Sequence, residues 1–100
     1  MTQHVIRYEQ QERVVLIGWD RPLQGYFLVV EDFEENPIYC NLDDVEAHPK
    51  HLQSFIDVLA RLNLPLSKEI ESELVTDKLE NIGNKCAHWV YENGFVRRLN

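Results

Sequence analysis

The chain lacks most of the features that would place a protein in a specialised class. Its 100 residues include only two cysteines, Cys40 and Cys86, whereas a disulfide-framed secreted domain of this size carries more. No apolar run approaches the roughly 18 residues needed to span a membrane, and residues 1–7 hold no apolar run of signal-peptide length. We therefore expect a cytoplasmic protein with reduced thiols and no membrane partner.

Clustered positive charge is also missing. The ten Lys and Arg residues are scattered, and the longest basic run is Arg97-Arg98. A protein that binds a phosphate backbone directly needs a basic footprint, so we expect no direct contact with nucleic acid. The four glycines are scattered too, which excludes a glycine-rich phosphate loop.

Groups that could bind a metal or perform catalysis occur only as isolated pairs. His48 and His51 lie three residues apart, and Cys86 lies near His88. Zinc needs three or four converging ligands, and a nucleophile needs an adjacent, oriented base. Neither requirement is met by these spacings. We expect no metal, no cofactor and no catalytic residue, and the pattern favours a protein that is not an enzyme.

The length, hydrophobic content and residue patterns of the chain predict one α+β domain over residues 1–100. A chain of this length with 44% hydrophobic residues can bury a single core without disulfides. The first 42 residues predict an antiparallel meander of three to four strands, at His4–Glu9, Arg13–Trp19, Tyr26–Val30 and Ile38–Leu42. The consecutive apolar residues from Val14 to Ile17 indicate a central strand that is buried on both faces.

Two helices are predicted after the meander. Pro49 suits the first position of the first helix, which we expect to end near Asn63 because Pro65 cannot continue it. Ser67 is a good N-cap for the second helix, and Gly83 is expected just after its C-terminus. Strands followed by helices indicate that both helices pack on one face of the sheet.

The last residues predict a β-hairpin. Asn93-Gly94 is the strongest two-residue hairpin turn, and we expect strands at residues 87–92 and 95–99 around it. This register pairs Tyr91 with Val96 and Trp89 with Arg98. The alternative continues the second helix through residues 84–92, but the residue types favour the hairpin.

One segment resembles a known group of proteins. The run Gly18-Trp19-Asp20-Arg21-Pro22-Leu23-Gln24-Gly25-Tyr26-Phe27 is similar to an N-terminal hairpin in a group of small, uncharacterised bacterial proteins. The resemblance extends more loosely through Asn41–Asp44 and Asn81–Asn84. It implies a bacterial cytoplasmic protein and supplies no known activity or catalytic residue.

All of the net charge lies in one segment. Between Glu31 and Glu46 the chain has seven acids and no base, whereas the remainder has ten acids and ten bases, so this segment accounts for the net −7. The acids are Glu31, Asp32, Glu34, Glu35, Asp43, Asp44 and Glu46. A binding function for the segment is our first hypothesis.

Two interpretations of the acidic segment compete. In the simpler one, Asp43, Asp44 and Glu46 stabilise the start of a helix, and the first four acids keep a strand end soluble. In the other, the acids form a stripe along the strand and bind a basic protein partner, with the function residing mainly at Glu31–Glu35.

Two further hypotheses remain. Asp20 and Arg21, with nearby His or Cys side chains, would form a ligand-binding loop or an enzyme site if they met in a cleft. Alternatively, the chain is a structural protein that associates with itself as a homodimer, through the terminal hairpin or an uncovered sheet face.

Overall fold

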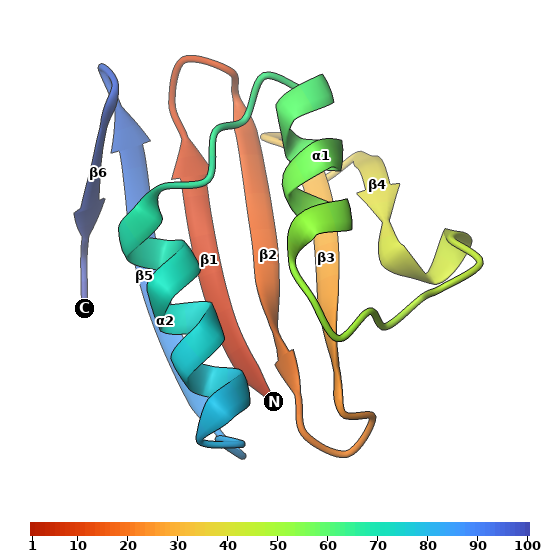
Figure 1. Cartoon of the computed structure of the whole chain (residues 1–100). Helices are drawn as coiled ribbons and strands as arrows, with labels where there is room; N and C mark the ends of the chain where they lie inside the picture. Colours follow the sequence, from red (N-terminus) through yellow and green to blue (C-terminus); the bar gives the residue numbers. More distant parts are fainter.

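A single mixed sheet of six strands organises the chain. The computed structural model describes residues 1–100, and both helices lie on the same face of this sheet (Figure 1). The strands are β1 (Thr2–Tyr8), β2 (Arg13–Asp20), β3 (Gly25–Asp32), β4 (Pro37–Cys40), β5 (Lys85–Glu92) and β6 (Phe95–Arg98). The helices are α1 (Gln53–Arg61) and α2 (Lys68–Leu79), and η1 (Asn41–Asp43) is a short 3₁₀ turn. The predicted α+β class is confirmed.

The spatial order of the strands is β4-β3-β2-β1-β5-β6. The predicted meander forms four strands of the sheet and the predicted hairpin forms the other two. They join through β1, which pairs antiparallel with β2 and parallel with β5, from Thr2 opposite Lys85 to Tyr8 opposite Tyr91. The helices supply the crossover connection that a parallel pair requires.

The core lies between the sheet and the two helices. Alternate strand residues face it, and Ile6, Tyr8, Val15 and Ile17 have no exposed surface. The helices contribute four equally buried side chains, with exposures of 0–1%: Phe55, Leu59, Ile70 and Leu74.

The helix boundaries confirm some predictions and correct others. Ser67 is the N-cap of α2, and its Oγ accepts a hydrogen bond from the N–H of Ile70 at 3.2 Å. Pro49 does not begin α1, because its carbonyl accepts a hydrogen bond from the N–H of Tyr26 at 2.8 Å and holds the chain against β3. Asn81, with φ 49°, takes the left-handed position after α2 that was predicted for Gly83.

The C-terminal hairpin is confirmed, so the helical alternative for residues 84–92 is wrong. Tyr91 pairs with Val96 and Trp89 with Arg98, as predicted. Asn93 and Gly94 have φ values of 54° and 81°, the two positive angles that a type I′ turn requires.

The fourth strand is shorter than predicted, and its end positions the acidic segment. It stops at Cys40, so Leu42 lies in η1 and not in a strand. The buried side chain of Asn41 accepts a hydrogen bond from the N–H of Leu28 and donates one to the carbonyl of Ala47. The chain between Asn41 and Ala47 is therefore a loop anchored at both ends by one side chain.

Candidate functional site

The seven acids lie near one edge of the sheet, beyond the two ends of β4 and not on the strand itself (Figure 1). Glu31–Glu35 occupy the end of β3 and the turn into β4, and Asp43–Glu46 follow the other end of β4. Four strand residues rise about 13 Å, so the two groups are separated along the edge. They form the predicted stripe and do not converge on one pocket. We call Glu31–Glu46 the acidic edge.

One acid of the first group has a structural role. The carboxylate of Asp32 accepts hydrogen bonds from the N–H of Glu34 and from the backbone and side-chain N–H groups of Asn36, at 2.8–3.0 Å. These bonds, the side-chain bond from Asn36 first, lower the pKa of Asp32 from 3.8. Asp32 therefore fixes the β3–β4 turn, while Glu34 and Glu35 are exposed.

The helix-start explanation for the second group is wrong. Helix α1 begins at Gln53, seven residues beyond Glu46, and has no acid in its first turn. Asp44 accepts a hydrogen bond from the hydroxyl of Tyr39. Burial and then this bond raise the pKa of Tyr39 above its usual 10.0. Asp43 and Glu46 are exposed, and their charges do not stabilise α1.

Apolar side chains are exposed among these acids. Leu42 is 68% exposed, Val45 is fully exposed and Ile38 is 40% exposed. Val45 also lines a shallow hollow of about 420 Å³ together with Asp44, Glu46 and Ser54 of α1. The acidic edge thus carries both the charge and the apolar contact area that protein interfaces combine.

Asp20 and Arg21 lie in the β2–β3 turn. The Oδ1 atom of Asp20 accepts a hydrogen bond from the N–H of Leu23 at 3.2 Å, and its side chain is largely buried. The side chain of Arg21 lies against Gly83, beyond the end of α2. Nearby, the indole of Trp19 donates a hydrogen bond to Asn81 at 3.0 Å. These contacts give the turn a structural role in joining β2 to α2.

His51 and the Cys86–His88 pair lie on opposite faces of the sheet. His51 lines a cleft on the helix-bearing face, whereas Cys86 and His88 alternate with buried residues of β5 and point to the other face, with Sγ and Nε2 3.5 Å apart. Three strands separate Cys40 from β5, and both thiols are free. No group of three or more potential metal ligands gathers anywhere in the chain.

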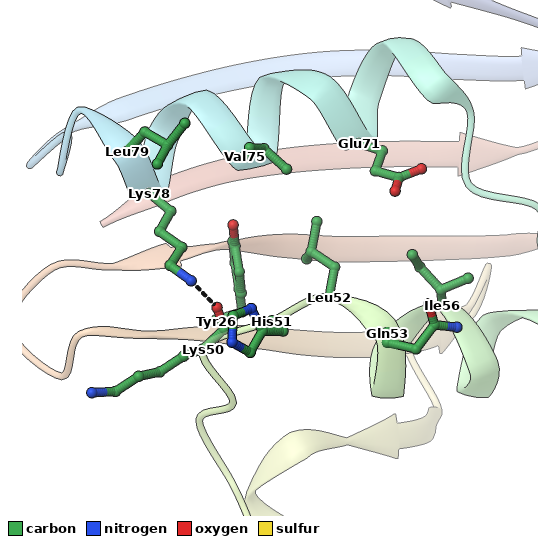
Figure 2. A pocket seen from close by; sticks show the side chains of 10 residues that line it. All are labelled: Tyr26, Lys50, His51, Leu52, Gln53, Ile56, Glu71, Val75, Lys78 and Leu79. Carbon is green, nitrogen blue, oxygen red and sulfur yellow. Dashed lines mark hydrogen bonds between the residues drawn. The ribbon is translucent and has the colours of Figure 1, made fainter.

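A cleft of about 320 Å³ separates α1 from α2. Figure 2 shows Val75 and Leu79 on one wall, Leu52 and Ile56 on the other, and Tyr26 between them. Two of its polar side chains are used within the fold: Lys78 donates a hydrogen bond to the carbonyl of Lys50 (Figure 2), and the hydroxyl of Tyr26 donates one to the carbonyl of Leu74 at 2.9 Å. The cleft contains neither Asp20 nor Arg21.

A buried polar network was not anticipated from the sequence. The Nδ1 atom of His4 accepts a hydrogen bond from the indole of Trp89, so its Nε2–H donates to Asp77 at 2.8 Å. Asp77 also accepts a bond from Lys85, which pairs with Glu73 at 2.9 Å. One signal was available, because Asp77 continues the apolar stripe of α2 seven residues after Ile70.

Comparisons with known proteins name no relative: no family model, curated protein or solved structure matches the chain. No helix is long and apolar enough to cross a membrane.

Proposed function

We propose that the protein is a small, non-enzymatic interaction protein of the bacterial cytoplasm whose acidic edge binds a basic protein partner. The proposal rests on the exposure of Leu42 and Val45 in the middle of a group of acids. These acids do not stabilise a helix, because α1 begins only at Gln53. A segment that served only solubility would have no use for exposed apolar side chains.

The two kinds of side chain have different roles in this proposal. The charges of Glu34, Glu35, Asp43 and Glu46 steer a basic surface toward the edge and make association dependent on salt. Leu42 and Val45 then lose water on contact, as the apolar centre of an interface does. Because the acids after β4 do not stabilise the start of α1, we assign the contact with the partner mainly to Leu42–Glu46. The sequence alone predicts that Glu31–Glu35 make most of this contact.

Co-purification from the native cell at several salt concentrations tests the proposal. The test variant is Glu34→Gln/Glu35→Gln/Asp43→Asn/Glu46→Gln, which spares Asp32 and Asp44 because their side chains hold the local structure. The control is Glu69→Gln/Glu80→Gln/Glu92→Gln, three exposed acids outside the edge. The test variant should lose a basic partner that the wild type and the control retain. Equal retention by all three proteins contradicts the proposal.

A second variant tests the apolar side chains. Leu42→Ser/Val45→Ser keeps every charge and should also release the partner, whereas Leu79→Ser, at a 77% exposed position on α2, should not.

A further inference from the structure

The central strands are apolar on both faces, although the helices cover only one of them (Figure 1). On the covered face of β2, Val15 and Ile17 have no exposed surface, whereas Val14 and Leu16 on the opposite face keep part of theirs. We call this opposite side the open face. The sequence predicts burial on both sides of β2, but within the single chain Val14 and Leu16 are only half-buried.

Strand register gathers the apolar side chains of the open face into a row. Leu16 is paired with Val5 of β1 on one side and with Val29 of β3 on the other. Val14 extends the row within β2, whereas Phe27 of β3 and Val90 of β5, on the same face, are already only 8% and 6% exposed within the single chain. The open face of an antiparallel sheet in a monomer normally carries polar residues, so an apolar row at its centre indicates a covering partner.

An unpaired base and an unpaired acid lie toward opposite edges of this face, and Glu92 of β5, which is exposed, is a second acid on it. Arg97 of β6 and Glu31 of β3 lie at the same height in the sheet, because Arg97 pairs with Val90, Val90 with Arg7, Arg7 with Val14, and Val14 with Glu31. Neither Arg97 nor Glu31 takes part in an ion pair within the chain. Arg7 is already paired with Glu9 at 2.5 Å and lies over the ring of Phe33.

We infer that the open face binds a second copy of this chain, with the two sheets packed face to face about a two-fold axis that runs along the strands. Rotation about this axis keeps each residue at the same level along the strands and exchanges the two edges of the sheet. Strand β6 of one copy therefore lies over β4 of the other. Arg97 of each copy then lies one strand away from Glu31 of its partner. The alternative axis, perpendicular to the strands, stacks the two acidic edges on each other and is repulsive.

The size of the face agrees with a modest dimer. Five spacings between strands of about 4.8 Å and roughly six residues of about 3.3 Å give a footprint near 500 Å² per copy. The total of about 1,000 Å² is at the lower limit for a specific interface, so the dimer dissociates on dilution. The arrangement leaves Leu42–Glu46 of both copies uncovered at the outer edges, and it is independent of the proposed basic partner.

Sedimentation velocity over a concentration series tests the dimer. The wild type should move from 11.8 kDa to twice that mass as concentration rises. Leu16→Lys places a charge at the centre of the open face and should stay monomeric. The matched control Leu79→Lys, on the helix-bearing side, should dimerise like the wild type.

A charge reversal tests the orientation and does not depend on how Leu16→Lys folds. Arg97→Glu, at an exposed position, should weaken the dimer about tenfold, and Arg97→Glu/Glu31→Arg should restore it. A wild type that remains monomeric at every concentration overturns the inference, as does a folded Leu16→Lys variant that still dimerises. Assemblies larger than two chains, or no recovery in the double variant, overturn the two-fold arrangement.

Discussion

The imidazole of His4 donates a hydrogen bond from Nε2 to the carboxylate of Asp77 at 2.8 Å, and neither side chain has any exposed surface. The bond links β1 to α2 across 73 residues of sequence. Trp89 of β5 donates to the other ring nitrogen at 3.2 Å. A single imidazole therefore connects the two strands of the parallel pair to the helix that covers them.

Removing the carboxylate of Asp77 should strongly destabilise the fold. In Asp77→Ala, His4 and Lys85 lose their shared acceptor, and the expected loss in the free energy of unfolding is about 3 kcal/mol. Urea unfolding measures it. Asp57→Ala, at an exposed position on α1, is the control and should change stability by less than about 0.5 kcal/mol. Equal stability of the two variants would show that the network is energetically neutral.

Stability should fall in acid because of the same network. Burial raises the pKa of Asp77 and of Glu73. Hydrogen bonds from His4 and Lys85 outweigh it for Asp77, and the hydrogen bond and charge of Lys85 outweigh it for Glu73, so both pKa values lie below the usual 3.8 and 4.5. The carboxyl groups of Asp77 and Glu73 bind protons more readily in the unfolded chain. The stabilisation is therefore present above pH 4.5 and is lost as the pH falls through the lowered pKa values of the folded chain. Glu73→Gln should show a shallower loss when urea unfolding is repeated between about pH 6 and 3; an unchanged slope contradicts this assignment.

Two tyrosines should make the fold sensitive to alkali. Burial, followed by the charge of Asp77, raises the pKa of Tyr26 from 10.0 to about 12, and burial also raises that of Tyr8. A raised pKa means that the stabilisation is complete below pH 10 and is lost as the pH rises toward the folded value. Tyr26→Phe should lose about 1 kcal/mol at neutral pH, because its bond to Leu74 is gone, and should unfold less steeply in alkali. Phenolate absorbance measured alongside unfolding tests this expectation.

Gly18 should tolerate substitution far less well than Gly94. A Cβ at Gly18 would lie 1.9 Å from the carbonyl oxygen of Thr2 and 2.8 Å from the ring of Phe27, so β1 and β2 would have to move apart. We expect Gly18→Ala to lose about 3 kcal/mol. Gly94→Ala meets no neighbour and should lose only about 1 kcal/mol, the cost of its φ of 81°. Thermal unfolding of both variants should give this order, and the reverse order would show that the close approach at Gly18 relaxes.

Local signals were enough to predict several parts of this fold. The turn at Asn93-Gly94 fixed the hairpin and its register, and Ser67 marked the start of α2. In both cases the decisive interaction lies within a few residues of the sequence that encodes it. The two-faced apolar pattern of β2 is also visible locally, but the burial of its second face depends on the inferred second copy and not on nearby residues.

Other parts depend on contacts between distant residues and were missed. Pro49 has the residue type of a helix start, but its carbonyl is bound to Tyr26, 23 positions earlier in the chain, so α1 begins later. The parallel pairing of β1 with β5 depends on the path of both helices. For the candidate site, the acids were evident from composition, whereas the exposure of Leu42 and Val45 follows from the loop that Asn41 anchors.

The affinity of the purified chain for its captured partner, measured against salt concentration, tests the central claim about the acidic edge most directly. We expect Kd to rise about tenfold between roughly 50 and 300 mM salt, because exposed charges are screened. Val45→Ser should weaken binding by a similar factor at every salt concentration, because it removes only apolar contact. A Kd that changes with neither salt nor Val45→Ser would contradict binding at the acidic edge.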